Sequence, residues 1–378
     1  RILVFDANTN APAANSTVTG NDGSYSFNLI PGSYYIKASK LGFQSIPPAN
    51  IIAVPFSVVL QQTTTMDFQM TPLTTSGLGT ISGQVTLSSK PAAGVLVVAS
   101  GTSAGFSSVT DKDGNYWIYN VPAGAYFVKA WGSSYNSSSA NVTLVSSGNS
   151  QNNILTLTSG ASGSVTGSVT FLATTNIEVD VSLVNPQTKE TIPGLTTSTS
   201  GGGYAISNVP AGTYIARASY ANDGKVVDPD WILKNGEPTV TVSTAAVNLN
   251  FSVTGAVSLT SPTNAASSIQ PLAVTSTTPT FSWSAYSSTD NYVIEVSDIN
   301  GNVIWGGFKN NGTVMNFAIP KITTSIAYNS NGAATQPLQN GQIYRWRIFA
   351  SKNDSGDPRG WKLISVSEEQ QGLIKITP

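Results

Sequence analysis

The residues best suited to chemistry in this sequence are a few carboxylates, because the chain has no cysteine and no histidine. This absence excludes disulfides, thiol nucleophiles and every mechanism that needs a histidine general acid or base. It also excludes metal sites built from thiolates or imidazoles. What remains is oxygen chemistry: calcium binding, or glycoside hydrolysis by two carboxylates set across a cleft.

Asp111 and Asp113 are the candidates for a metal site, and they stand in an Asp-x-Asp-Gly sequence. This spacing resembles the start of a calcium loop, in which carboxylate oxygens bind Ca²⁺. However, no acidic residue follows at the position that would close such a loop, and Asp-Gly is a standard pair for a hairpin turn. We therefore expect a turn, with calcium binding by Asp111 and Asp113 as the alternative, and no other cofactor.

Two further acidic pairs lie near the end of the chain, Glu368 with Glu369 and Asp354 with Asp357. Neighbouring residues on a strand point to opposite faces, so the two glutamates cannot converge on one substrate. The two aspartates flank a glycine and a proline in a stretch that indicates an exposed loop. We expect solvated charge at both pairs, no catalytic residue and no enzyme activity.

Tryptophans could form a platform for sugar rings, because their flat faces suit pyranose rings. Alternating aromatic residues on strands more often pack cores, and Trp283 and Trp346 fit that pattern. Carbohydrate binding is therefore the alternative interpretation for the other five: Trp117, Trp131, Trp231, Trp305 and Trp361.

The composition points away from nucleic acids and membranes. The 10% of charged residues is well below the roughly 25% of ordinary soluble domains, so the surface must be rich in uncharged polar residues. A net charge of −1 lacks the concentrated positive charge that binds phosphate backbones, so we expect no nucleic-acid partner. No long apolar run occurs, so we expect no transmembrane segment. Because position 1 is Arg and no signal peptide precedes it, we interpret the chain as the processed form of an exported protein.

An internal repeat of about 90 residues organises the first two thirds of the chain. Its anchor residues Tyr25, Tyr116 and Tyr204 follow one another at intervals of 91 and 88 residues. Around each anchor, apolar and polar residues alternate with period two between turn clusters, which predicts β-strands. Asp-Gly or Gly-Gly precedes each anchor and supplies the positive φ of a hairpin turn. No stretch combines helical spacing with good helix formers, so we expect no helix.

The second copy of the repeat carries the clearest motifs, Thr-Asp-Lys-Asp-Gly-Asn-Tyr at Thr110–Tyr116 and Val-Pro-Ala-Gly-Ala-Tyr at Val121–Tyr126. With these motifs, roughly residues 1–255 resemble the carboxypeptidase-regulatory-like, transthyretin-type sandwich repeats of exported bacterial proteins. The resemblance implies stalks, spacers or binding accessories. The third copy has Ser200–Gly203 in place of the acidic turn, so the resemblance implies no shared function for that turn.

From about Ser258 the repeat stops and the chain resembles a fibronectin type III domain. Pro279–Trp283, Tyr292–Val296 and Gly341–Ile348 read as the strands around which such a sandwich packs. We therefore expect an all-β fold of four tandem β-sandwich domains, Ig-like or transthyretin-like, stacked end to end. The expected bounds are 1–75, 76–160, 161–256 and 257–371, followed by a separate segment 372–378.

The first repeat begins one strand late. Repeats two and three open with Gly79–Leu87 and Gly163–Phe171, whereas Arg1–Thr9 aligns with the second strand of repeat three. A sandwich without its first strand has an unpaired edge and an open apolar groove, which proteins normally protect or use for strand addition. Gly372–Pro378 has the Gly-x-Ile-x-Ile spacing of a first strand. We expect this segment to be spare and to complete repeat one of a neighbouring molecule.

Head-to-tail donation builds an open filament unless its rotation closes a ring. We therefore expect a structural subunit of a secreted, pilus-like filament on a prokaryotic cell surface, with copies of itself as partners. The expected polymer interface comprises Ile2 and Val4 on the acceptor side and Leu373, Ile374 and Ile376 on the donor side. Two alternatives stay open. The chain could be a trimmed piece of a longer protein, or a stalk, adhesive or carbohydrate-binding region of a larger secreted protein that contacts glycans or other cells.

Overall fold

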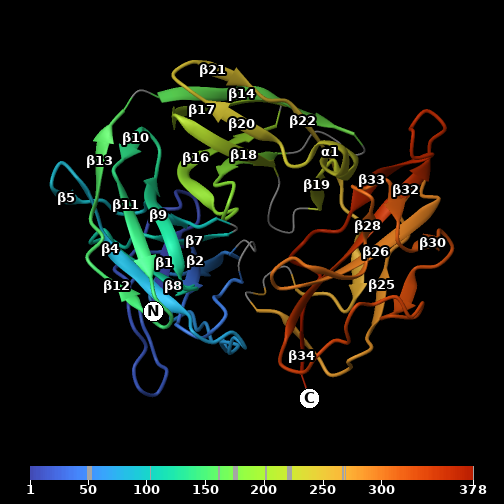
Figure 1. Cartoon of the computed structure of the whole chain (residues 1–378), viewed down its shortest axis with the longest axis horizontal. Helices are drawn as coiled ribbons and strands as arrows, with labels where there is room; N and C mark the ends of the chain where they lie inside the picture. Colours follow the sequence, from blue (N-terminus) through green and yellow to red (C-terminus); the bar gives the residue numbers. More distant parts are fainter. Residues whose placement is uncertain are drawn as a thin grey trace.

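The ordered elements of the protein are almost all β-strands, which form four successive modules, of which the last three are two-sheet β-sandwiches (Figure 1). The computed structural model describes residues 1–48, 53–102, 104–160, 162–172, 178–200, 202–218, 224–265, 268 and 270–377. We call the modules 1 to 4 in chain order. The all-β class and the tandem sandwiches are confirmed, because alternating apolar residues pair into sheets whose inner faces pack together.

Module 2 shows the complete plan of the repeat. One sheet has β4 at its centre, antiparallel to β8 on one side and parallel to β12 and β13 on the other. The second sheet has the order β11-β9-β6-β7, and the core lies between the two sheets. The strands are β4 (Gly79–Leu87), β5 (Lys90–Pro91), β6 (Leu96–Ser100), β7 (Gly105–Val109), β8 (Asn115–Val121), β9 (Gly124–Trp131), β10 (Tyr135–Ser137), β11 (Ser139–Leu144), β12 (Asn149–Ser150) and β13 (Leu155–Ser159).

Module 3 repeats this plan. Its strand β14 is antiparallel to β17 and parallel to β21 and β22, and its second sheet has the order β16-β15-β18-β20. The elements are β14 (Ser162–Phe171), β15 (Val179–Val184), β16 (Thr191–Thr199), β17 (Gly203–Pro210), β18 (Gly212–Ala218), β19 (Lys225–Val227), α1 (Pro229–Asn235), β20 (Thr239–Val242), β21 (Ala246–Asn248) and β22 (Phe251–Gly255).

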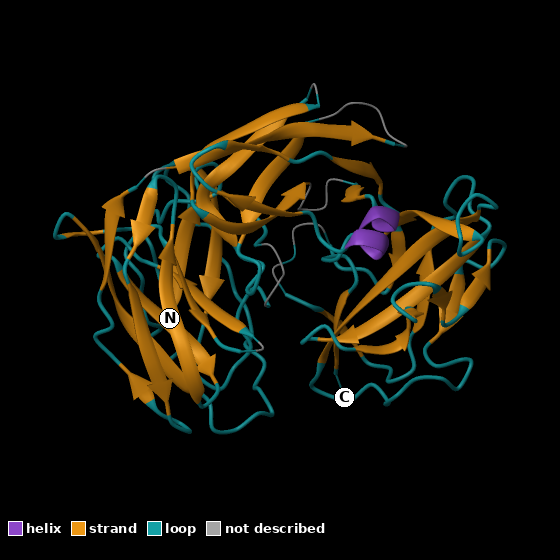
Figure 2. Ribbon diagram, turned by 45° about the horizontal axis from the view of Figure 1, so that its top comes forward, coloured by secondary structure: helices purple, strands orange, loops and turns teal. Residues whose placement is uncertain are grey.

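The helix α1 was not expected from the sequence, and that prediction was wrong. The Asp228 carboxylate accepts hydrogen bonds from the backbone N–H groups of Asp230 and Trp231, and Pro229 occupies the first turn. The helix is only seven residues long, so its capping residues indicate it in the sequence more clearly than any repeating apolar pattern does. Figure 2 shows it at the junction of modules 3 and 4. In the described part of the chain, no helix is long and apolar enough to cross a membrane.

Module 1 has one sheet among the described residues, formed by β1 (Ile2–Asp6), β2 (Gly32–Ala38) and β3 (Phe56–Val58) in that order. Strand β1 pairs antiparallel with β2. The segments 24–30 and 65–70, which correspond to the strands on either side of β4 in module 2 and of β14 in module 3, have no strand assignment here.

Module 4 is a sandwich with a different strand order. A sheet β23-β25-β31 packs against a larger sheet β24-β34-β32-β26-β27, to which β30 and β33 also belong, and β28 pairs with β29. The strands are β23 (Leu259–Ser261), β24 (Leu272–Val274), β25 (Thr280–Trp283), β26 (Asn291–Asp298), β27 (Val303–Gly306), β28 (Phe308–Lys309), β29 (Val314–Met315), β30 (Ala318–Pro320), β31 (Ser325–Ala327), β32 (Ile343–Asn353), β33 (Trp361–Val366) and β34 (Leu373–Ile376).

The first three modules pack side by side, which corrects the expected end-to-end stack. Leu3 and Phe5 of module 1 lie in one buried cluster with Val98 of module 2 and Val181 and Leu183 of module 3. Residues that point away from one sandwich core are therefore apolar because they face another module. Figure 1 shows the four modules following an arc, from blue and cyan through green to red.

Candidate functional site

The candidate site is defined by the first strand of modules 2 and 3. This strand, β4 or β14, lies in the middle of one sheet. On β4, Ile81 and Val85 face the core and are fully buried, and Val165 and Val169 hold the same places on β14. A glycine stands between the two aliphatic residues in each strand, Gly83 in β4 and the corresponding glycine in β14.

A tyrosine crosses this strand at the glycine. Gly83 pairs with Tyr116 and Gly167 pairs with Tyr204, and paired residues share a face of the sheet. The Tyr116 hydroxyl donates to the carbonyl of Asn153 at 2.9 Å, on the far side of β4. The Tyr204 hydroxyl makes the same bond across β14, at 2.6 Å. Each tyrosine therefore ties together the two segments that flank the central strand.

Module 1 keeps the tyrosine bridge, but none of its described residues forms a central strand beneath it. The Tyr25 hydroxyl donates to the carbonyl of Met66 at 2.6 Å. Residues 25–30 and 66–70 therefore correspond to the two flanking segments. Among the described residues, no backbone-to-backbone hydrogen bond involves residues 25–29 or 66–70. We call the place between these two segments the open strand position.

Apolar side chains of module 1 are more exposed than the corresponding side chains of modules 2 and 3, as expected for a core that no strand covers. Ile30 is 77% exposed, whereas Val121 and Val209, which also precede the Pro of the turn, are 0% exposed. Four other apolar side chains beside the open strand position are only partly buried, while their counterparts in modules 2 and 3 lie in the cores: Tyr25, Phe27, Phe68 and Met70. The open strand position is thus an apolar surface that lacks its cover.

The outer edge of the segment 66–70 is already occupied. The side-chain amide of Gln270, from module 4, accepts a hydrogen bond from the backbone N–H of Gln69 at 3.0 Å and donates to the carbonyl of Asp67 at 3.2 Å. Peptide groups alternate in direction along an extended chain, so those of Phe68 face the other way, toward the open strand position.

The expected interface residues lie elsewhere in the structure. Ile2 and Val4 pair with β2 and are 1% and 0% exposed, in the core of module 1. They lie in the same cluster as the apolar residues that flank the open strand position, and their place in a polymer interface stays a prediction. The flanking residues themselves were missed, although aligning the anchor tyrosines and the Pro turns of the three repeats could have found them.

The expectation that residues 372–378 are a spare strand was wrong. Strand β34 lies between β24 and β32 and pairs with both. Its residues Leu373, Ile374 and Ile376 are 3%, 0% and 0% exposed. The Gly-x-Ile-x-Ile pattern is that of a strand in the core of module 4, and removing it would uncover that core.

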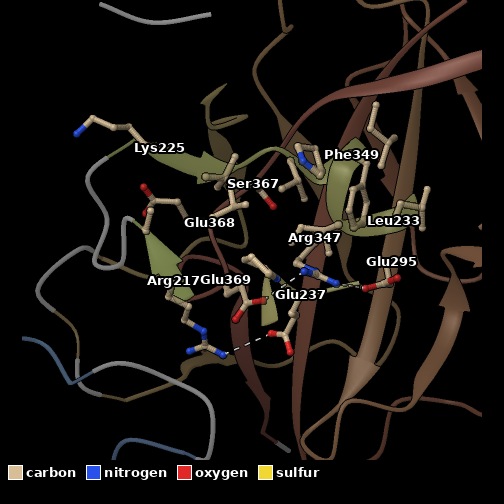
Figure 3. A pocket seen from close by; sticks show the side chains of 18 of the residues that line it. Arg217, Lys225, Leu233, Glu237, Glu295, Arg347, Phe349, Ser367, Glu368 and Glu369 are labelled. Carbon is tan, nitrogen blue, oxygen red and sulfur yellow. Dashed lines mark hydrogen bonds and ion pairs between the residues drawn. The ribbon is translucent and has the colours of Figure 1, made fainter. Parts of the chain in front are cut away.

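A cleft of about 300 Å³ lies between modules 3 and 4. Figure 3 shows Arg347 between Glu295 and Glu369, with Arg217 directed toward Glu237. Arg347 pairs with Glu295 at 2.6 Å and with Glu369 at 3.3 Å. Glu368 and Glu369 both line this cleft, and Glu368 is buried, which corrects the expectation that they point apart as solvated charges.

The pair Asp354 and Asp357 corrects the expectation of solvated charge. The side chain of Asp357 is only 5% exposed and pairs with Arg359 at 2.9 Å and with Lys234 of α1 at 2.7 Å. Hydrogen bonds from Arg359 and Lys234 hold the pKa of Asp357 far below its usual value. Arg359 also reaches Asp230 at 2.6 Å. This network joins α1 of module 3 to the loop before β33 of module 4.

Comparison with known proteins agrees with the repeat. Residues 80–158 match the family model of the carboxypeptidase regulatory-like domain. This range is module 2, so the resemblance seen in the sequence is confirmed there. No curated protein matches the chain.

Solved structures similar to the chain include three bacterial proteins. The TIE protein of Bacillus anthracis shares 13% identity, over 99% of this chain and 65% of that chain, with a TM-score of 0.20. The chain therefore spans about 65% of the length of that protein. GBS52, the minor pilin of Streptococcus agalactiae, shares 11% identity over 49% of this chain and all of that chain, with a TM-score of 0.20. A carbohydrate binding protein from Bacteroides uniformis, so named provisionally, shares 18% identity over 57% of this chain and all of that chain, with a TM-score of 0.21.

The acidic turn of module 2 has a structural role. One carboxylate oxygen of Asp111 accepts hydrogen bonds from the backbone N–H groups of Asp113 and Asn115. The other accepts from the hydroxyl of Ser16 in module 1, at 2.9 Å. No group of three acidic side chains suited to a metal ion occurs in the described part of the chain. Calcium binding by Asp111 and Asp113 stays a prediction.

The tryptophans proposed as a sugar platform are spread over several modules. In the carboxypeptidase regulatory-like domain, Trp117 lies under the Arg1 guanidinium and Trp131 packs edge-on against Tyr214 of module 3. In module 4, Trp305 is in the core and Trp361 stacks on a phenylalanine. Trp231 lies in α1 of module 3. The five residues thus come from three modules, and glycan binding stays a prediction.

Proposed function

We propose that the chain is a non-catalytic structural subunit of a bacterial surface polymer, and that a neighbouring subunit lends module 1 a β-strand. The tandem sandwich fold and the carboxypeptidase regulatory-like domain support a structural role outside the cell. The absence of histidine and cysteine from the sequence is consistent with a role that needs no catalyst.

The observation that carries the proposal is the exposure of Ile30 at the open strand position, beside a core that is closed in both other repeats. Inserting a strand there would bury apolar side chains and would satisfy peptide groups on both flanking segments. The lent strand cannot be β4, β14 or β34 without opening another sheet, because each of these strands is paired on both sides. The proposal therefore assigns the lent strand to a part of the neighbouring subunit other than these three strands.

The test measures, by fluorescence anisotropy, how a labelled peptide with the sequence of residues 79–87 binds to the intact chain. We expect saturable binding and slower hydrogen exchange at residues 25–30 and 66–70. A scrambled peptide controls for composition. A matched variant of the chain, with residues 79–95 fused in front of Arg1, carries a strand that fills the position and should not bind the peptide.

Two results would contradict the proposal. Equal binding to the intact chain and to the fused variant would place the peptide elsewhere on the protein. Protection of residues 25–30 and 66–70 by the fused strand alone, and never by the free peptide, would show that module 1 is completed by its own polypeptide, and the polymer part of the proposal would be wrong.

A further inference from the structure

We infer that the open strand position selects a lent strand with glycine directly opposite Tyr25 and an aliphatic residue two positions to each side. This inference rests on the proposed function and names the chemistry of the partner, a strand of a neighbouring subunit with the pattern aliphatic-x-Gly-x-aliphatic. It follows from the contacts of the two central strands that the structure does show.

Glycine is required because a Cβ atom at this position would collide with the carbonyl oxygen that accepts the hydrogen bond from the tyrosine. A Cβ atom on Gly83 would lie 2.0 Å from the carbonyl oxygen of Asn153, and one on Gly167 would lie 2.0 Å from that of Leu249. These are the same oxygens that accept from Tyr116 and Tyr204. A backbone oxygen cannot move aside as a flexible side chain can, so each strand must carry glycine where the tyrosine crosses.

The same steric constraint is present in module 1. Its carbonyl at Met66 accepts from Tyr25 at 2.6 Å, as the corresponding carbonyls do in the intact repeats. A strand that enters between the two segments would meet this oxygen and the tyrosine ring at one residue. The uncovered side chains of Phe27 and Phe68 would then contact the aliphatic residues of the strand, as their counterparts contact Ile81 and Val85.

The same constraint explains why the C-terminal segment is a poor partner. In the register expected from the sequence, with Gly372 in the place of Gly79, Ile376 would stand in the place of Gly83. A branched side chain would then meet the Met66 carbonyl. Strand β34 thus fails by its chemistry as well as by its burial in module 4.

The test compares three peptides on one unchanged protein, so that no variant can fail to fold. They have the sequence of residues 79–87, that sequence with Gly83→Ala, and that sequence with Ser82→Ala. Ser82 lies on the outer face of β4, so Ser82→Ala, which removes a hydroxyl group, is a control for a substitution away from the core. We expect Gly83→Ala to weaken binding by about five- to 150-fold, which corresponds to 1–3 kcal/mol of overpacking, and Ser82→Ala to change it less than about threefold.

Each outcome bears on a different statement. Alanine is better than glycine inside a strand by about 0.5–1 kcal/mol, so the intrinsic preference opposes the expected loss. If the parent peptide binds and Gly83→Ala binds equally well, the selection for glycine is wrong while the proposed function stands. If the parent peptide does not bind, the proposed function itself fails.

Discussion

At the scale of single residues, one carbonyl oxygen and one tyrosine hydroxyl organise each repeat. The oxygens of Met66, Asn153 and Leu249 accept the bond that holds the sheet segments on either side of the first strand. The anchor tyrosines could be read from the sequence, since they recur with the repeat. Their partners could not, because the accepting atom is in the backbone and any residue can supply it.

The requirement for glycine can be tested inside the chain as well. Gly167→Ala should destabilise module 3 by about 1–3 kcal/mol, because its Cβ would meet the Leu249 carbonyl. The matched control is Gly203→Ala on the neighbouring strand, where an added Cβ has nothing within 4 Å. Urea unfolding followed by circular dichroism measures both. Equal midpoints for the two variants would contradict the role assigned to the glycine.

At the scale of elements, α1 and β33 show how a contact between modules depends on charge. Asp357 and Asp230 lie among Lys234 and Arg359, and Asp357 is almost fully covered. The sequence shows these residues only as scattered charges in a loop and a short polar stretch. Their meeting depends on how modules 3 and 4 pack, which no local pattern encodes.

This network predicts a pH dependence of stability. The pKa of Asp357 is lower in the folded protein than the value of about 3.9 in an unfolded chain. Its contribution is therefore complete above pH 3.9 and is lost as the pH falls through the folded value. Asp357→Asn should reduce stability at pH 7 and flatten the decline below about pH 4.

The matched control is Asp113→Asn, because Asp113 lies in an exposed turn of module 2, far from the network. Thermal unfolding between pH 2 and pH 7, followed by the fluorescence of the module 4 tryptophans, gives the comparison. An acid limb in Asp357→Asn as steep as that of the unchanged chain would rule out this account.

At the scale of the whole molecule, modules 1 to 3 share buried side chains and should unfold together. Phe5 is 1% exposed in the cluster that spans all three. Phe5→Ala should cost about 3–5 kcal/mol and lower the unfolding temperature of modules 1 to 3 as one transition. The matched variant Phe281→Ala should affect module 4, whose cluster is separate. Differential scanning calorimetry distinguishes the two, and a shift confined to module 1 would disprove the shared core.

The sequence by itself determined the turns, the repeat, the all-β class and most strands of modules 2 to 4, but the strand expected around Tyr25 is not assigned in the structure. These depend on period-two alternation and on Gly, Pro, Asn and Asp at turns, which are local properties of the chain. It also showed which residues of the three copies correspond, because that comparison needs only the copies that the chain itself contains. The short helix was not predicted in this way, because two capping hydrogen bonds and a proline leave little sequence pattern in seven residues.

Only the tertiary structure decided where the strands belong and what they face. The alternation of Leu373–Ile376 suits any buried strand, and its place between β24 and β32 follows from the partners available in module 4. The apolar residues Leu3 and Phe5 look like either face of one sandwich, and only the packing shows that they contact other modules. Burial is a property of neighbours that are distant in sequence, so it was the fold that moved the binding hypothesis from the C-terminal segment to the open strand position of module 1.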